Sequence, residues 1–414
     1  MSRDRLHYLF LNIGHFLDHL FMLIFATVAA LVLTNEWGVS YAEMVPYAMP
    51  GFIAFGVFSL PAGWLADRFS REAMIGVFFV GIGLASIGTA FATTPVELAI
   101  GLFVVGVFAA IYHPVGLALI AGGSGPLGMS IAVNGVWGNL GVGSAALLTG
   151  AMIDAINWQA AFVIPGIVSV VCGIAYVALF RDRMALNARN ATAPPTATRT
   201  GTNEVEPDQR RLLIRLVMII FFTTAVGSII FQSTTFALPK VFEERLGDIA
   251  GSATMIGWLA FVVFAVASLA QVAVGLSLDR FGARTVFLVV ATIQIIFFAM
   301  MPGLTDVWAL AVAFAFMVGA FGQIPINDYM IGRTAKSELR ASIYGARYVV
   351  TFVVLAATLP LISWVHATWG FDMLFRILAV AAVALFLAVL LLPQRIPTPE
   401  DGELAPSDAT PARA

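Results

Sequence analysis

The chain has 414 residues, of which 60% are hydrophobic and only 11% are charged, and its mean hydropathy is +0.93. Soluble domains contain about 25% charged residues, so a soluble fold of this size is excluded and lipid must surround much of the chain. The formal net charge of −2 does not point to nucleic acid as a partner, and the single cysteine, Cys172, excludes an internal disulfide or a cysteine metal cluster.

Twelve stretches long and apolar enough to cross a bilayer follow one another along the chain. A spanning helix needs about 20 mostly apolar residues, and it satisfies its own backbone hydrogen bonds inside lipid. The expected spans are 9–33, 44–66, 73–93, 97–121, 128–153, 159–180, 213–238, 253–277, 285–303, 307–331, 341–364 and 370–392. The sequence therefore predicts an all-α membrane protein with twelve transmembrane helices. No small-residue cleavage site follows the first stretch, so we interpret it as a span and not as a signal peptide.

The distribution of basic residues assigns each loop to one side of the membrane. Arginine and lysine gather before the first span and after the second, sixth, eighth, tenth and twelfth spans, whereas the alternate loops carry mainly acidic residues. Basic loops stay in the cytoplasm. We therefore expect a multi-pass protein of a bacterial inner membrane with both termini in the cytoplasm.

The composition of the chain changes after the sixth span. Residues 182–211 are rich in Ala, Thr, Pro and charge, which predicts a flexible cytoplasmic linker, and 394–414 reads as a disordered tail. The linker separates two predicted six-helix bundles, 1–181 and 212–393. An internal repeat supports this division, because the pattern Gly-x-x-x-Asp-Arg-Phe occurs once in each half.

These features resemble the major facilitator superfamily, whose signature after the second span is G-x-x-x-D-R/K-x-G-R/K-R/K. The first copy matches at Gly63, Asp67, Arg68 and Arg71, and the later copy matches at Gly275, Asp279, Arg280, Gly282 and Arg284. Ser70 and Glu72 depart from the signature in the first copy. The resemblance implies two pseudo-symmetric bundles working by alternating access, with these charged residues as a conformational latch between the halves. The alternative is that they only fix the topology.

Three motifs in the first half carry a narrower resemblance, to the fosmidomycin-resistance-like branch of drug efflux proteins. They are Gly14-His15-Phe16-Leu17-Asp18-His19, Tyr112-His113-Pro114 and Asn134-Gly135-Val136-Trp137-Gly138-Asn139-Leu140-Gly141. This likeness implies proton-coupled efflux of a small organic compound. The antiporter signature G-x-x-x-G-P-x-x-G-G is incomplete, since no proline follows Gly138 or Gly141.

Ionisable side chains inside the expected spans are costly in lipid and mark candidate functional residues. His15, Asp18 and His19 share one helical face by their spacing, and His113 stands beside Pro114, which opens the fourth span locally. Three interpretations stay open for these four side chains. They form a proton relay centred on Asp18 with His113 or His19, or a divalent-metal site with nitrogen and oxygen ligands. In the third interpretation, His15 and His19 lie near the cytoplasmic end and are merely solvated or hydrogen-bonded.

Polar residues of other spans complete the predicted substrate and proton pathway. They are Tyr112, Asn134, Asn139, Gln232, Gln323, Asn327, Asp328 and Arg347. Arg347 holds an anionic group of the substrate or forms a structural ion pair, and Asp328 pairs with Arg333 or Arg347. The glycines of the fifth span permit close helix approach.

The sequence lacks the motifs of ATP-driven transport and of enzymatic catalysis. Gly122-Gly123-Ser124-Gly125 lacks the lysine of a phosphate-binding loop, and no nucleophile-and-base pair indicates an enzyme. We expect a monomeric secondary transporter without a cofactor, with a small-molecule substrate, protons as coupling ion and the lipid bilayer as its surroundings. The alternatives are uptake of a small organic anion, transport of a divalent metal, or a membrane receptor or scaffold that has lost transport.

Overall fold

The computed structural model describes residues 2–122, 127–190, 207–247, 249–334 and 337–394, and every regular element in these ranges is a helix. Eleven helical stretches are long and apolar enough to cross a membrane. The last of them has 42 residues and turns at Gly370, whose φ of 73° interrupts the helix. At 1.5 Å per residue this stretch is about 63 Å long, twice the thickness of a bilayer core, so it holds two spans. The twelve-span prediction is confirmed.

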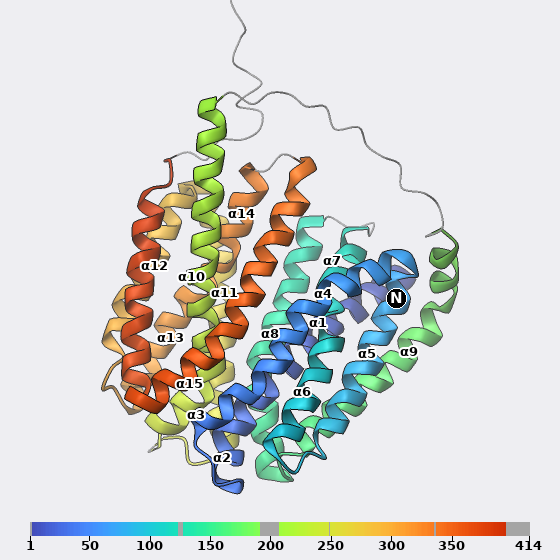
Figure 1. Cartoon of the computed structure of the whole chain (residues 1–414), viewed down its shortest axis with the longest axis horizontal. Coiled ribbons are helices and arrows are strands. Elements are labelled where there is room, and N and C mark those ends of the chain that lie inside the picture. Colours follow the sequence, from blue (N-terminus) through green and yellow to red (C-terminus); the bar gives the residue numbers. More distant parts are fainter. Residues whose placement is uncertain (1, 123–126, 191–206, 248, 335–336, 395–414) are drawn as a thin grey trace, which may run out of the picture.

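The first half of the chain holds the first six spans (Figure 1). Short breaks divide several of these spans, so that they contain more than one helix. The elements are α1 (Arg3–Val28), the π-helix η1 (Ala29–Leu33), α2 (Thr34–Glu36), α3 (Tyr41–Met44), the 3-10 helix η2 (Val45–Ala48), α4 (Met49–Arg68), α5 (Arg71–Thr89), α6 (Pro95–Ala109), α7 (Tyr112–Ala121), α8 (Leu127–Ala155) and α9 (Ala160–Asn190).

The second half holds the remaining spans. Its helices are α10 (Pro207–Arg245), α11 (Ala253–Phe281), α12 (Ala283–Met300), α13 (Asp306–Gly322), α14 (Ile324–Thr334) and α15 (Ser337–Leu390). The predicted linker 182–211 overlaps the end of α9 and the start of α10, and its middle, 191–206, lies outside the described residues. Residues 395–414 of the predicted tail also lie outside them.

The fourth and tenth spans are broken at equivalent places in the two halves. The break lies at residues 110–111 between α6 and α7, and at Gln323 between α13 and α14. Pro114 and Pro325 stand in the first turn after each break. Proline has no N–H, and its ring clashes with the carbonyl four residues earlier, yet it fits the first turn of a new helix. Each break therefore begins a short helix inside the membrane, and these two helices carry the polar residues of the candidate site.

The two halves meet on the side of the molecule that carries α2 and α3, which we call the α2–α3 side (Figure 1). The linker side, where α9 ends and α10 begins, lies opposite. On the α2–α3 side, Asp154 of α8 accepts a hydrogen bond of 2.7 Å from the backbone N–H of Thr254, in the first turn of α11. Ser363 of α15 donates to the carbonyl of Ala42, at 2.6 Å. The start of α11 is thus capped by a side chain of the other half.

Two glycines let α8 and α11 touch through their backbones. A Cβ atom on Gly150 would lie 2.3 Å from the carbonyl oxygen of Ala253, and one on Gly257 would lie 2.5 Å from the carbonyl oxygen of Ala146. Real Cβ atoms do not approach backbone oxygens so closely. The contact between the halves therefore requires glycine at both positions.

A second network on the α2–α3 side joins α10 to α15, and the sequence analysis did not find it. His366 contacts a carboxylate oxygen of Glu244 at 3.0 Å, and Lys240 contacts Glu243 at 2.5 Å. Arg245 forms an ion pair with Asp372. The His366–Glu244 and Arg245–Asp372 contacts hold the two helices together at the edge where α15 also meets α3, whereas the Lys240–Glu243 pair lies within α10.

Substitution of Gly150 by valine is expected to disfavour contact between the halves on the α2–α3 side. Overpacking costs about 1–3 kcal/mol, which shifts the ratio of the open to the closed arrangement by about 5- to 150-fold. The readout is the rate at which a membrane-impermeant thiol reagent labels Ala146→Cys, in a chain that also carries Cys172→Ser. Gly135→Val is the matched control, because it lies in the same helix with nothing within 4 Å of its added Cβ. Equal labelling of the two variants would contradict the role of Gly150.

Candidate functional site in the first half

α1 supplies three of the four ionisable side chains expected at the site. Its N-terminus is stabilised by Ser2, whose hydroxyl accepts a hydrogen bond from the Arg5 amide. Within the span, His15, Asp18 and His19 lie on one face of this helix. These side chains point toward α7, which provides the fourth member, His113.

The structure brings the four side chains together. The Nε2 atom of His113 lies 3.4 Å from Oδ2 of Asp18. The ring of His113 lies 5.2 Å from that of His15 and 5.4 Å from that of His19, measured between centroids. The carboxylate of Asp18 is fully buried, and neither of its oxygens has a hydrogen-bond donor among the described residues. We call His15, Asp18, His19 and His113 the histidine–aspartate cluster.

The orientation of His15 is set by α8. Its Nδ1 atom lies 2.7 Å from the carbonyl oxygen of Asn134. A carbonyl only accepts, so Nδ1 carries the proton, and Nε2 of the neutral ring presents a lone pair. The Nε2 atom of His19 lies 3.1 Å from Nε2 of His15. His15 is 93% buried, which excludes the interpretation of a solvated side chain for this residue.

Tyr112 and Asn134 form a hydrogen-bonded network next to the cluster. The Tyr112 hydroxyl donates to the carbonyl of Leu11 at 2.7 Å, and the Asn134 amide donates to that hydroxyl at 2.8 Å. The same amide donates to Asn12 at 2.9 Å. His15 also stacks on the Tyr112 ring, with centroids 4.9 Å apart. Asn12 was missed by the sequence analysis, although its place one helical turn before His15 is a signal that could have found it.

Glycines of α8 let it pack closely against α1. A Cβ on Gly138 would lie 2.6 Å from Nε2 of His15, and a Cβ on Gly141 would lie 2.2 Å from the carbonyl oxygen of Phe16. The glycine-rich segment of the fifth span therefore serves helix packing, and through Gly138 it also leaves room for the His15 ring.

The polar residues predicted in the tenth span form a group that is separate from the histidine–aspartate cluster. Gln323 donates to the carbonyl of Gly227 at 2.8 Å and accepts from Gln294 at 3.0 Å, while Thr223 donates to Asn327 at 2.9 Å. Gln294 and Thr223 are fully buried and were not predicted. Gln323 thus joins α10 and α12 to the break in the tenth span. Among the described residues, these hydrogen bonds do not extend to Asn139 or Gln232.

Arg347 and Asp328 form an ion pair between α15 and α14. The side chain of Arg347 is only 13% exposed, whereas that of Asp328 is 44% exposed. The Nε atom of Arg347 is buried and has no hydrogen-bond partner among the described residues. Arg333, the other partner considered for Asp328, donates to Tyr329 at 2.6 Å.

An aromatic contact lies between the two polar groups. The ring of Phe55 in α4 lies 5.7 Å from the ring of His113 and 5.0 Å from that of Phe352 in α15. Phe55 therefore links the histidine–aspartate cluster of the first half to the arginine-bearing helix of the second.

The predicted latch residues lie on the linker side and are mostly exposed. Asp67 forms an ion pair with Arg71 of the same loop, at 2.7 Å. Arg68 lies over the ring of Trp64, and Arg280 lies over that of Phe281. These contacts stay within one half, so a latch between the halves remains a prediction. Exposed pairs of this kind contribute about 0–1 kcal/mol.

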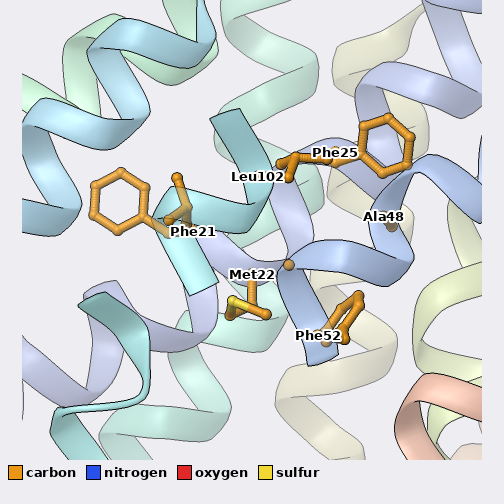
Figure 2. Close-up of a pocket in the computed structure, with 8 residues that line it drawn as sticks. Phe21, Met22, Phe25, Ala48, Phe52 and Leu102 are labelled. Atoms are coloured by element: carbon orange, nitrogen blue, oxygen red, sulfur yellow. The ribbon is translucent and has the colours of Figure 1, made fainter. Parts of the chain in front are cut away.

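A pocket in the first half is lined by apolar residues and by none of the four residues of the histidine–aspartate cluster (Figure 2). Phe21, Met22 and Phe25 of α1 face Phe52 and Leu102 across it. Its lining offers no charged or hydrogen-bonding side chain, so we assign it to helix packing.

Comparison with known proteins identifies the family and some relatives. The profile of the Major Facilitator Superfamily matches residues 11–248 and 220–414. A 4-hydroxybenzoate transporter, PcaK, of Pseudomonas aeruginosa is 23% identical over 408 residues, covering 87% of this chain and 86% of that protein. A gallate transporter of Pseudomonas putida is 35% identical over 68 residues, covering 16% of this chain and 15% of that protein.

Solved transporters share the fold. A D-xylose–proton symporter superposes with a TM-score of 0.72 at 12% identity, covering 95% of this chain and 99% of that one. A peptide transporter, POT, superposes with a TM-score of 0.70 at 15% identity, covering 93% of each chain.

The narrower resemblance drawn from the sequence requires correction. Motifs at 14–19, 112–114 and 134–141 suggested the fosmidomycin-resistance-like efflux branch, but the curated relatives are transporters of aromatic acids. The three motifs build the buried network of α1, α7 and α8, and such a network does not specify what is transported. The structure and the profile match establish the broader assignment: the chain belongs to the major facilitator superfamily and is a multi-pass membrane transporter, not an enzyme.

Proposed function

We propose that this protein takes up small aromatic acids across a bacterial inner membrane together with protons. The observation that carries the proposal is the Asp18 carboxylate, fully buried near the middle of α1 and 3.4 Å from His113. An ionised carboxylate at this depth without donors is costly, whereas a protonated one can donate to His113. Such a residue couples transport to protons if its protonated form is favoured when the site opens to one side of the membrane and its ionised form when the site opens to the other side.

Arg347 is the proposed site for the carboxylate of the substrate. It is a largely buried basic side chain of α15, and its guanidinium has donors beyond the one that binds Asp328. Arginine binds carboxylates through two parallel hydrogen bonds. The aromatic ring of Phe55 contacts both His113 and Phe352, which is on the same helix as Arg347, and such rings suit the ring of an aromatic acid.

The proposed substrate class rests on the relatives. The relatives are named as transporters of 4-hydroxybenzoate and gallate, which are small aromatic acids. Uptake of an organic anion was an alternative interpretation of the sequence, and it accounts for Arg347 without a further assumption. Orientation with both termini in the cytoplasm, which the basic loops predict, belongs to the same proposal.

Asp18→Asn is expected to uncouple transport from protons. Purified protein is reconstituted into liposomes, and radiolabelled 4-hydroxybenzoate is added with a pH gradient, acidic outside. The wild-type chain accumulates the label above equilibrium, and Asp18→Asn loses this accumulation by more than about tenfold, because an amide cannot carry the proton. The variant keeps exchange of label against unlabelled substrate, which needs no proton movement. Accumulation equal to wild type in Asp18→Asn would contradict the coupling role.

Arg347→Gln is expected to weaken binding of the acid selectively. Hydrogen bonds to charged groups contribute about 1.5–3 kcal/mol, so the inhibition constant of 4-hydroxybenzoate should rise by roughly 10- to 150-fold. The constant for the neutral amide analogue, 4-hydroxybenzamide, should stay within about twofold. Both are measured by competition in the exchange assay, with Arg333→Gln as the control on the linker side. An equal loss for acid and amide would instead make Arg347 a structural residue.

A further inference from the structure

The histidine–aspartate cluster has the geometry of a metal site as well as that of a proton relay. One ring nitrogen from each of His15, His19 and His113 can be chosen so that all three lie within 4.8 Å of one another. In other clusters of three histidines, such an arrangement surrounds a single ion at about 2.0–2.1 Å from each nitrogen. The three rings come from α1 and α7, which are fixed relative to each other by Tyr112.

The orientation of the rings leaves lone pairs for an ion. His15 donates its Nδ1–H to the carbonyl of Asn134, as metal-binding histidines commonly do with a backbone carbonyl. Its Nε2 lone pair therefore faces the cluster. The Nε2 atoms of His15 and His19 are 3.1 Å apart, close to the ligand separation of about 3.3 Å in a tetrahedral zinc site.

Asp18 provides the negative charge that a divalent ion needs. Its Oδ2 atom is 3.4 Å from Nε2 of His113, so the carboxylate adjoins the group of three histidines. Both of its oxygens are buried without a hydrogen-bond donor among the described residues. A buried carboxylate without donors is destabilising, and a cation bound next to it would compensate its charge.

We propose that His15, His19 and His113 bind one Zn²⁺ ion within the first half, next to the Asp18 carboxylate. Three imidazoles form a ligand set that suits zinc, and calcium and magnesium prefer oxygen ligands. The His113 side chain is 18% exposed, so it is not completely enclosed by protein. A bound ion next to Asp18 favours the ionised carboxylate and opposes its protonation, so Zn²⁺ is expected to inhibit uptake. This consequence rests on the proposed function, whereas the binding does not.

The test measures Zn²⁺ binding to the purified full-length chain, from which any histidine tag has been removed. Calorimetry gives the affinity and stoichiometry, and the visible absorption of Co²⁺ reports tetrahedral geometry. We expect one ion per chain, with affinity lowered by more than about 100-fold in His113→Gln. His366→Gln is the matched control, because it removes a histidine that lies on the α2–α3 side and contacts Glu244.

A second pair of variants keeps every ligand. Gly138→Ala places a methyl group 2.6 Å from the current position of Nε2 of His15, so it should block the ion or displace the ring and weaken Zn²⁺ binding by at least about tenfold. Gly135→Ala, one turn earlier in α8, meets open space and should bind as wild type.

Absence of Zn²⁺ binding to the wild-type chain would overturn the inference, as would equal effects of Gly138→Ala and Gly135→Ala, or of His113→Gln and His366→Gln. The experiment contains no aromatic acid and no proton gradient. Its failure would therefore leave the proposed uptake untouched, and failure of uptake would leave the metal site standing.

Discussion

The contact between Asp18 and His113 is the constraint on which the first half of the molecule depends. A carboxylate in the middle of a membrane-spanning helix is costly, and the chain surrounds it with groups whose positions are fixed from three helices. Tyr112 ties α7 to α1, Asn134 ties α8 to both, and Gly138 leaves the space that the His15 ring fills. The packing of α1, α7 and α8 thus serves to hold one buried acid beside one imidazole.

The two halves share an architecture but not a chemistry. Both contain a proline-directed break in the equivalent span, and in both the short helix after the break carries polar side chains. In the first half the short helix after the break brings His113 to a buried carboxylate. In the second half Gln323, at the break, joins neighbouring helices, and Asp328 forms an ion pair with Arg347. This difference supports a division of labour in the proposed mechanism, with proton binding on one side of the transport path and the substrate anion on the other. The glycine contact between α8 and α11 holds the halves together on the α2–α3 side.

The sequence was informative wherever the relevant residues are local. Hydropathy predicted the spans, the spacing of His15, Asp18 and His19 predicted their shared face, and Pro114 predicted the break in the fourth span. Contacts between distant segments were out of reach of spacing rules. That His113 meets Asp18 depends on how α7 packs on α1, which no spacing rule gives. Gln294 and the Glu244–His366 contact gave no local signal at all, because one glutamine in an apolar stretch or one histidine in a long helix is common in structural roles.

The central claim is that Asp18 carries the proton that moves with the substrate. It is tested most directly by a pH-sensitive dye trapped inside liposomes that contain the protein, with an inward gradient of 4-hydroxybenzoate and no imposed pH gradient. The account predicts that the wild-type chain acidifies the interior faster than protein-free liposomes do, and that Asp18→Asn acidifies it no faster than protein-free liposomes. Acidification by Asp18→Asn at the wild-type rate would contradict the account.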